Sequence, residues 1–192
     1  SDYEIQFFNW KSNKVVYTEI NNRENSYETI IIYSYGNCES INSVYSFCKS
    51  LANKTGTKVI IYEYPGFGLN FNSDPSPTER RIKEYSLAVT DLIFEKYPES
   101  RIVHYGRSLG SGPACYACYK RPKVSGLVLE SAFTTIFHTI VDFPFKIYGV
   151  LFRNIDIIGK IDTPLLLIHG LSDRIVPYHH SVELQKNSKN VW

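Results

Sequence analysis

Residues 101–112 read RIVHYGRSLGSG, and this stretch decides the fold. The apolar segment 101–105 predicts a strand, and the small residues after Gly110 predict a helix. Between them Ser108 stands in a G-x-S-x-G pattern, which is typical of a sharp strand-to-helix turn that exposes a serine hydroxyl above a sheet. Glycine is needed at positions 106 and 110 because a side chain there would collide with neighbouring backbone. We therefore predict a nucleophile elbow, with Ser108 as the candidate nucleophile.

The composition is that of an ordinary globular protein. The chain has 192 residues, 43% of them hydrophobic, and a formal net charge of +2. This length predicts one domain over residues 1–192. Basic residues form only short clusters, so we expect no nucleic-acid partner. The longest apolar stretch, residues 143–152, is interrupted by Pro144 and Lys146 and is too short to cross a bilayer.

The N-terminus has no basic segment followed by an apolar core, so a secretory signal is not expected. We expect a cytoplasmic protein and leave open a peripheral contact with a membrane. The oligomeric state also stays open.

Strands and helices are predicted to alternate along the chain. Residues 3–8 and 15–20 predict an antiparallel hairpin. Further buried strands are expected at residues 29–33, 59–62, 101–105, 124–129 and 165–168. The alternation predicts an α/β fold with a mostly parallel sheet and helices on both faces.

Two helices have clear boundaries in the sequence. Helical spacing of apolar residues begins at Glu39 and stops at Gly56. A second helix is expected to begin with Ser76 as N-cap, Pro77 at the first helical position and Glu79 closing a capping box. Pro98 then ends this helix before the elbow strand.

The four cysteines do not form a recognisable metal or redox motif. Cys115 and Cys118 make a C-x-x-C, but they fall among small residues in the helix after the elbow. A zinc site would need a second pair of ligands at suitable spacing, which Cys38 and Cys48 do not supply. We expect buried packing roles for Cys115 and Cys118, and we also expect a reduced setting, no metal and no cofactor.

Reactive groups of such a sheet gather at the carboxyl ends of its strands. The loop 34–38 follows one strand, and Ser108 follows another. An oxyanion in this arrangement is bound by the backbone N–H after the nucleophile and by one from the earlier loop. The first would come from Leu109, and the second from Asn37 or Cys38.

The acid is expected from the loop that follows the strand 165–168. Asp173 lies in a turn there and could accept the Nδ1 proton of a histidine. Asp162 precedes that strand and so lies at the wrong end of the sheet. Glu130 lies near the correct end and remains a weaker substitute.

The general base is not evident in the sequence. The order of elements requires a histidine after Asp173, where only His179 and His180 occur, at the start of an expected helix. They follow Asp173 too closely for a strand to intervene, so a surface or packing role is favoured and they remain only weaker candidates for the base. The remaining histidines are His104 in the elbow strand, His169 with a backbone-supporting role, and His138 in an aromatic region.

A final strand is expected to begin at Val191 and Trp192, where the given sequence ends. We therefore expect a domain truncated at its C-terminus, with the histidine beyond residue 192. Without a base, the chain is expected to be nearly inactive.

Several segments together resemble the alpha/beta-hydrolase superfamily. They are YPGFG at 64–68, YGRSLGSG at 105–112, PLLLIHG at 164–170 with Asp173, and FRNID at 152–156. The resemblance is closest to the alpha/beta hydrolase domain-containing protein 17 group, whose members remove palmitate from protein cysteines. It implies Ser108 as nucleophile, Asp173 as acid, and Leu109 with Asn37 or Cys38 as oxyanion donors.

Three departures from that group are visible. The group's His-Gly-Asn loop stands here as Tyr35-Gly36-Asn37, its cysteine-rich N-terminal segment is absent, and its glycine-and-histidine loop with the last helix is missing. Membrane anchoring through that N-terminal segment is therefore not carried over.

Two hypotheses about function follow. The first is a serine hydrolase that cleaves an ester or thioester of an acylated small molecule, lipid or protein, including an acyl-protein thioesterase. The second is a pseudoenzyme or binding module that keeps the fold without a base. An aromatic region could line an acyl groove or rest on a membrane, although core packing is equally compatible: Phe133, Phe137, Phe143, Phe145, Tyr148, Leu151 and Phe152.

Overall fold

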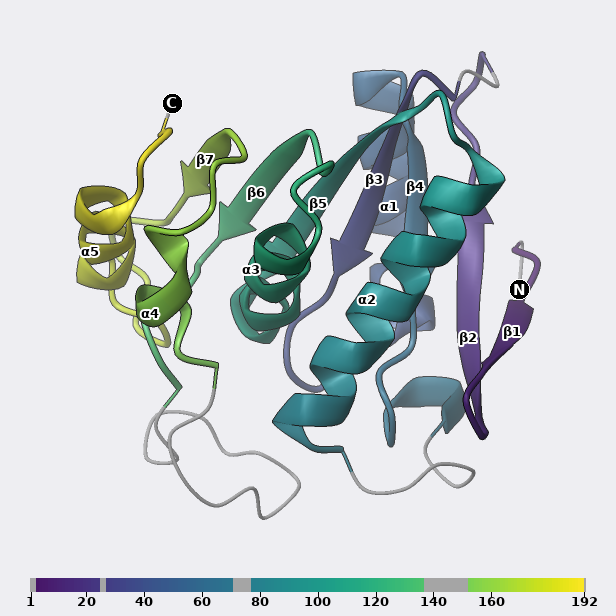
Figure 1. Ribbon diagram of the computed structural model, residues 1–192, viewed down its shortest axis with the longest axis horizontal. Coiled ribbons are helices and arrows are strands. Elements are labelled where there is room, and N and C mark those ends of the chain that lie inside the picture. The colour runs from purple at the N-terminus through teal and green to yellow at the C-terminus, as the bar shows by residue number, and fades with distance from the viewer. Residues whose placement is uncertain (1–2, 25–26, 71–76, 137–151, 192) are drawn as a thin grey trace. The chain divides into compact units, whose positions relative to one another are not determined.

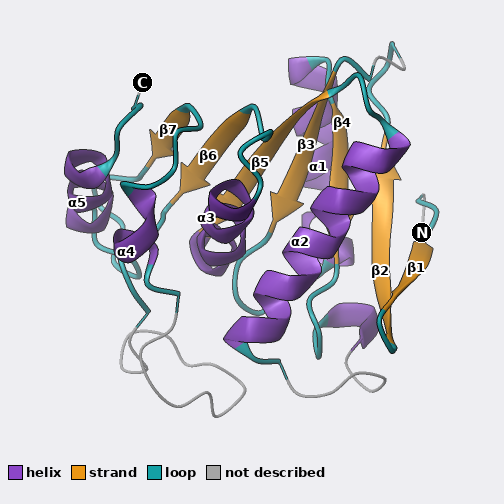
Figure 2. Ribbon diagram, viewed as in Figure 1, coloured by secondary structure: helices purple, strands orange, loops and turns teal. Residues whose placement is uncertain are grey.

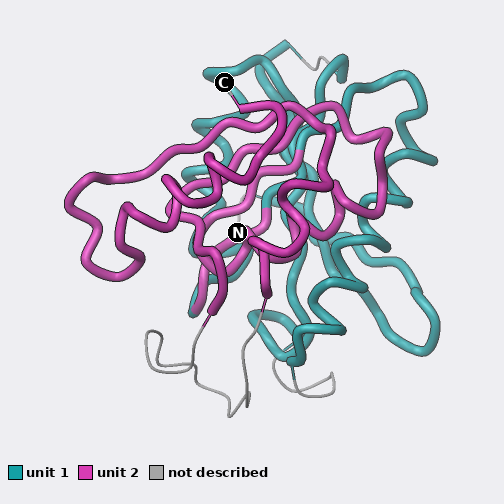
Figure 3. Tube along the Cα trace, turned by 60° about the vertical axis from the view of Figure 1, so that its left-hand side comes forward, with its two compact units in different colours: residues 1–33, 38–103 teal, residues 34–37, 104–192 magenta. Residues whose placement is uncertain are grey.

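The computed structural model describes residues 3–24, 27–70, 77–136 and 152–191 (Figure 1). The chain divides into two compact units, which Figure 3 colours separately. The first unit holds residues 1–33 and 38–103, and the second holds residues 34–37 and 104–192. The division passes through two strands, so each of these strands contributes residues to both units.

The first unit is built on an antiparallel hairpin joined to a parallel pair. Strands β1 (Gln6–Trp10) and β2 (Asn13–Ile20) pair antiparallel, and β2 pairs antiparallel with β4 (Lys58–Tyr62). Strand β3 (Thr29–Ser34) then pairs parallel with β4, which gives the order β1-β2-β4-β3. Every residue of β4 is buried, as expected for a strand covered on both faces. The predicted hairpin and both buried strands are confirmed.

Two long helices lie on opposite faces of these strands (Figure 2). Helix α1 (Ile41–Thr55) begins after the N-cap Ser40 and ends at Gly56, whose φ of 66° is the left-handed conformation that favours glycine. Helix α2 (Glu79–Lys96) begins two residues later than predicted. Thr78 is its N-cap, because the Thr78 hydroxyl accepts a hydrogen bond from the Arg81 N–H at 3.2 Å. The prediction of a helix starting at Pro77 was wrong.

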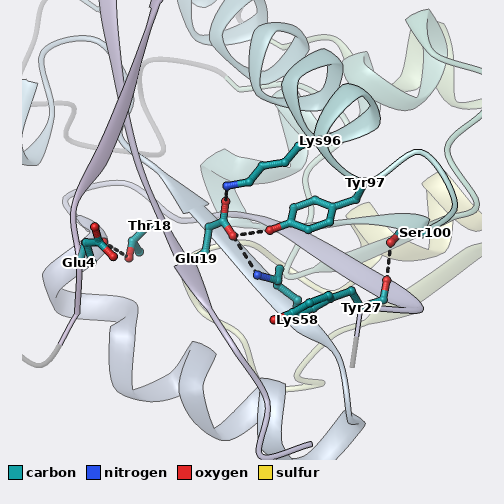
Figure 4. A network of polar contacts seen from close by, with 8 residues as sticks. All are labelled: Glu4, Thr18, Glu19, Tyr27, Lys58, Lys96, Tyr97 and Ser100. Atoms are coloured by element: carbon teal, nitrogen blue, oxygen red, sulfur yellow. Dashed lines mark hydrogen bonds and ion pairs between the residues drawn. The ribbon is translucent and has the colours of Figure 1, made fainter. Parts of the chain in front are cut away.

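A buried carboxylate joins β2, β4 and the end of α2 (Figure 4). Glu19 accepts hydrogen bonds from the Lys58 Nζ at 2.8 Å, the Lys96 Nζ at 2.5 Å and the Tyr97 hydroxyl at 2.7 Å. The side chains of Glu19 and Lys58 are only 8% and 4% exposed. The Lys58 ammonium also faces the rings of Tyr27 and Tyr97, 4.3 and 5.0 Å from their centres, so its charge is enclosed on several sides.

The second unit contains the end of β5 (Arg101–Arg107), then β6 (Gly126–Glu130) and β7 (Leu165–Ile168) in that order. Strands β6 and β7 pair parallel. A 3₁₀ turn, η2 (Ser108–Gly110), leads from β5 into α3 (Ser111–Lys120). Helix α3 packs on β6 and on α4 (Asn154–Ile158), and α5 (His179–Asn187) packs on α4 and β7. The predicted strands and the helix start near His179 are confirmed.

Strand β7 is less enclosed than β4. Leu165 is buried, whereas Leu166 and Ile168 on the alternate face are 44% and 42% exposed. Val191, where a final strand was expected to begin, forms a parallel bridge with Leu165. Within the described ranges, no helix is both long and apolar enough to cross a membrane.

Candidate active site

The elbow around Ser108 has the backbone conformation that the sequence predicts for it. Strand β5 ends at Arg107 with extended backbone, and Ser108 then adopts a φ of 49°. Residues other than glycine rarely occupy this left-handed region, since the Cβ approaches the carbonyl oxygen there. Such strain at a non-glycine residue is typical of functional sites. The turn presents a partly exposed Ser108 at the carboxyl end of β5.

The two glycines of the motif are required by close packing. A Cβ on Gly106 would lie 2.5 Å from the Gly110 carbonyl oxygen and 2.8 Å from the Ala114 Cβ. A Cβ on Gly110 would lie 1.9 Å from the carbonyl oxygen of Ser34. The predicted reason for glycine at these positions is therefore confirmed.

The loop expected to complete an oxyanion site lies beside the elbow. Residues 34–37 belong to the same unit as the elbow, and the Ser34 carbonyl touches Gly110. Asn37 is half-buried and Leu109 is buried. Cys38 is exposed, has a φ of 60° and belongs to the first unit. The geometry brings Asn37 and Leu109 into one unit, and the choice between Asn37 and Cys38 as second donor stays a prediction.

Asp173 lies in the acid loop, residues 169–178 between β7 and α5. Its Oδ1 accepts hydrogen bonds from the N–H groups of Ile175 at 2.9 Å and Val176 at 3.0 Å. Burial alone would raise the pKa of this carboxyl, but these two amides, the Ser131 side chain and the nearby His169 together lower it. Asp173 is thus held as a carboxylate, the form that can orient an imidazole.

The described histidines are buried or contact residues other than Ser108. His180 accepts from the Thr134 N–H at 3.4 Å, its Nδ1 lies 3.0 Å from the Thr134 Oγ1, and its ring stacks on His179. Burial, followed by the neighbouring His179, lowers the pKa of His180. His104 is buried in β5, and burial lowers its pKa to about 3. His138 lies outside the described residues. In the part of the chain that the structure describes, no histidine hydrogen bonds to the Ser108 hydroxyl.

His169 also has other partners. Its Nε2 lies 2.7 Å from the Val176 carbonyl oxygen, and its Nδ1 lies 2.6 Å from the Ser181 hydroxyl. The same Nε2 is 3.6 Å from the Asp173 Oδ2. His169 therefore lies within the acid loop as a structural neighbour of Asp173.

The two weaker acid candidates are placed as follows. Glu130, at the end of β6, accepts a hydrogen bond from the Tyr105 hydroxyl at 2.7 Å and lies 3.5 Å from the Arg107 Nε. Glu130 therefore holds the end of the elbow strand through Tyr105 and Arg107. The sequence did not predict these contacts, because Glu130 is distant from both residues along the chain. Asp162 precedes β7, is 78% exposed and pairs with the Lys189 Nζ at 2.9 Å.

Helix α4 contacts the start of α3, the helix that follows the elbow. Its first residue, Asn154, is buried and donates hydrogen bonds to the Ser111 hydroxyl at 3.2 Å and the Phe133 carbonyl at 3.0 Å. Gly112 leaves space for Phe152, since a Cβ there would lie 2.2 Å from the Phe152 ring. Phe133 and Phe152 are buried, so these two aromatic residues pack in the core. The other aromatic-region candidates, at positions 137, 143, 145, 148 and 151, lie outside the described residues.

Three of the four cysteines are buried. Cys48, Cys115 and Cys118 are buried free thiols, and Cys38 is an exposed one. Burial raises the pKa values of Cys48, Cys115 and Cys118. In the described ranges, no group of three or more histidine, cysteine or acidic side chains could hold a metal ion.

A family model described as serine aminopeptidase, S33, matches residues 25–157. The chain belongs to this family. The matched region includes the elbow, the loop after β3 and the start of α4. The chain is an alpha/beta hydrolase, and relatives in the domain-containing protein 17 group support the resemblance to that group.

Curated sequence relatives are also alpha/beta hydrolases. The chain is 28% identical to human alpha/beta hydrolase domain-containing protein 17B over 158 residues, which are 80% of this chain and 53% of that protein. It spans about half the length of several curated relatives that it matches.

Two solved structures have the same α/β-hydrolase fold. Est1E from Butyrivibrio proteoclasticus, with ferulic acid bound, has a TM-score of 0.78 at 19% identity, over 97% of this chain and 87% of that chain. A soluble variant of monoglyceride lipase from Saccharomyces cerevisiae, bound to a substrate analogue, has a TM-score of 0.75 at 16% identity, over 98% and 83%. At these identities the likeness establishes the fold.

Proposed function

We propose that this alpha/beta hydrolase is a serine hydrolase that cleaves an ester or thioester through an acyl-enzyme formed on Ser108. The observation that carries the proposal is the left-handed φ of 49° at Ser108 between two glycines that tolerate no side chain. A structural turn has no need for a serine in this conformation, because glycine adopts it without strain.

In the proposed reaction, the Ser108 hydroxyl oxygen attacks the carbonyl carbon of the substrate while its proton passes to a base. The resulting oxyanion accepts hydrogen bonds from the Leu109 N–H and from the N–H of Asn37 or Cys38. Collapse expels an alcohol or thiol, which takes up the proton, and leaves the acyl group on Ser108. Water then attacks this ester and releases the acid.

Asp173 is the proposed acid of this reaction. Its lowered pKa keeps it ionised, and a carboxylate in this loop suits the orientation of an imidazolium during proton transfer. Two backbone amides already fix one carboxylate oxygen, so the group needs little reorganisation when a histidine donates to it.

The base is the missing component among the described side chains. Loss of the histidine from a serine triad lowers turnover by up to ~10⁶-fold. We therefore propose that the 192-residue chain reacts slowly, with the oxyanion donors and substrate binding supplying the remaining rate enhancement.

We further propose that the substrate is an acyl group in thioester or ester linkage to a protein, lipid or small molecule. The support is the resemblance to the domain-containing protein 17 group, at 28% identity to the human 17B protein. Removal of palmitate from a protein cysteine is the specific reaction that this resemblance implies.

A binding protein that retains the fold is the second candidate. It is favoured by the contacts of His169 and His180, which engage Val176, Ser181 and Thr134 and leave Ser108 without a described imidazole partner. Such a protein would bind acylated partners without turnover.

A fluorophosphonate probe separates the two candidates. For the hydrolase, we expect slow covalent labelling of the folded chain, with the modified peptide containing Ser108. Labelling should disappear in Ser108→Ala and persist in Ser172→Ala, which removes an exposed serine from the acid loop. If the folded chain reacts no faster than the urea-unfolded chain, the hydrolase proposal fails and the binding protein is favoured.

A further inference from the structure

The imidazole of His169 bridges the start and the end of the acid loop. Its side chain is 1% exposed. One ring nitrogen contacts the Val176 carbonyl oxygen at 2.7 Å, and the other contacts the Ser181 hydroxyl in the first turn of α5 at 2.6 Å. The ring edge also packs against Tyr178, with ring centres 5.8 Å apart. The loop is therefore closed by one side chain that contacts its last residues and the following helix.

These contacts fix the tautomer of His169. A carbonyl oxygen only accepts hydrogen bonds, so the Nε2 that faces Val176 carries the proton. The Nδ1 is then an acceptor, and the Ser181 hydroxyl donates to it. Because both nitrogens are engaged, the ring has no lone pair directed at an incoming serine proton.

Val176 links this ring to the candidate acid. The Val176 carbonyl accepts from His169, while the Val176 N–H donates to the Asp173 Oδ1 at 3.0 Å. The neighbouring Ile175 N–H donates to the same oxygen at 2.9 Å. A shift of the loop end away from His169 would thus withdraw the amides that hold the carboxylate.

We propose that His169 is a positioning residue that fixes the Asp173 carboxylate through Val176. This inference rests on the proposed function, because Asp173 matters to catalysis only if it is the acid of the hydrolase. In this role His169 neither accepts the serine proton nor touches substrate. It sets where the carboxylate stands and which of its oxygens remains available to a histidine.

The first test needs no substitution. The ¹⁵N signals of the His169 ring, measured at about pH 8 where imidazoles are neutral, distinguish the two tautomers. We expect the Nε2–H tautomer, with Nδ1 showing the shift of a hydrogen-bond acceptor. A predominant Nδ1–H tautomer would overturn the proposal, because the ring could not then donate to Val176.

The second test compares substitutions at one position. His169→Phe keeps a ring but loses both hydrogen bonds, whereas His169→Gln keeps an N–H that can reach the Val176 carbonyl. In the Phe variant we expect the Asp173 pKa, read from its ¹³Cγ signal, to rise towards that of an ordinary aspartate. We also expect roughly tenfold faster hydrogen exchange at the Val176 amide, the scale of one lost hydrogen bond.

The Gln variant should keep the slow exchange of the Val176 amide and the part of the lowered Asp173 pKa that comes from the backbone amides, and it should lose only the direct charge effect of His169. His179→Gln should change neither value. An unchanged Asp173 pKa in a folded Phe variant would overturn the proposal. If the Phe variant does not fold, two measurements still test the positioning role. They are the tautomer of His169 and the comparison of the Gln variant with the unsubstituted chain.

These readouts do not depend on hydrolysis. If the probe fails to label Ser108 while the tautomer and the Asp173 titration behave as expected, the hydrolase proposal fails and the positioning contact stands. If the probe labels Ser108 but His169 has the Nδ1–H tautomer, the hydrolase proposal stands and the positioning role of His169 fails.

Discussion

The carbonyl oxygen of Ser34 lies 1.9 Å from the point that a Cβ on Gly110 would occupy. The last residue of β3 and the turn after Ser108 are therefore in backbone contact. Because this contact joins the candidate oxyanion loop to the candidate nucleophile, the spacing between the two is set by main-chain atoms and tolerates little change.

A methyl group at Gly110 should disrupt this contact. We expect Gly110→Ala to lower the free energy of unfolding by about 3 kcal/mol, because the clash is with backbone that cannot rotate away. Urea denaturation measures the change. Gly170→Ala is the matched control, since nothing lies within 4 Å of its added Cβ, and it should cost less than about 0.5 kcal/mol. Equal losses in the two variants would contradict the packing argument.

The left-handed backbone at Ser108 predicts a reversal of the usual preference between alanine and glycine. Ser108→Gly should be more stable than Ser108→Ala by about 1 kcal/mol, because only glycine adopts this φ without strain. At Ser111, which has helical backbone with a φ of −62°, alanine should be more stable than glycine by about 1 kcal/mol. Thermal unfolding of the four variants tests the sign at each position.

The Glu19 network predicts a loss of stability in acid. Burial would raise the Glu19 pKa, but hydrogen bonds from Lys58, Lys96 and Tyr97 outweigh burial and lower it below its ordinary 4.5. A carboxyl with a lowered folded-state pKa stabilises the protein above the unfolded-state pKa, and the contribution disappears as pH falls through the folded-state value. We expect the Glu19-dependent part of stability to be constant above about pH 5 and to decline below it.

Glu19→Gln tests this contribution directly. In this variant, the free energy of unfolding should fall less steeply as the pH drops below about 5. At neutral pH the free energy of unfolding should be about 3 kcal/mol lower than in the unsubstituted protein, because Lys58 remains buried without its counter-charge. Glu28→Gln removes an exposed carboxylate that pairs with Arg101, so its effect should be small. If stability falls with pH below about 5 in the same way in the Glu19 variant and the unsubstituted protein, Glu19 does not cause the loss of stability in acid.

The cysteines should differ sharply in reactivity. Cys38 is exposed, whereas burial raises the pKa of Cys115 to about 12 and also raises that of Cys118. Only a thiolate reacts rapidly with an alkylating agent. Iodoacetamide should therefore modify Cys38 in the folded protein and reach the buried thiols only after unfolding, as peptide mass spectrometry can follow. Rapid modification of Cys118 in the folded chain would indicate a reactive C-x-x-C pair.

Much of the fold could be predicted because local signals and packing requirements agree. The strand before Gly106 and the helix after Gly110 follow from apolar patterning, and the elbow follows from its glycines. The start of α2 could not be fixed in this way, because both Ser76 and Thr78 are suitable N-caps. In the structure Pro77 precedes the helix and packs so closely on Gly66 that a Cβ there would lie 2.7 Å from the proline ring.

For the candidate site, the sequence predicted which loops contain the functional residues but not the contacts within those loops. The position of Asp173 after β7 follows from the order of elements, but its partners do not. The contacts of Val176 with His169 and Asp173 depend on how the loop folds back on itself, and no periodic pattern of residues in the sequence predicts such folding. The Glu19 network was missed for a similar reason, since Lys58 and Lys96 approach Glu19 only through the pairing of β2 with β4 and the packing of α2.

The division of the chain into units has a practical meaning for protein engineering. The second unit takes residues 34–37 from an early part of the sequence and everything else from residue 104 onward. A contiguous fragment that starts at residue 104 would therefore keep Ser108 and Asp173 but lose the segment that touches Gly110. No single continuous stretch of the sequence therefore encodes the second unit without also including most of the first.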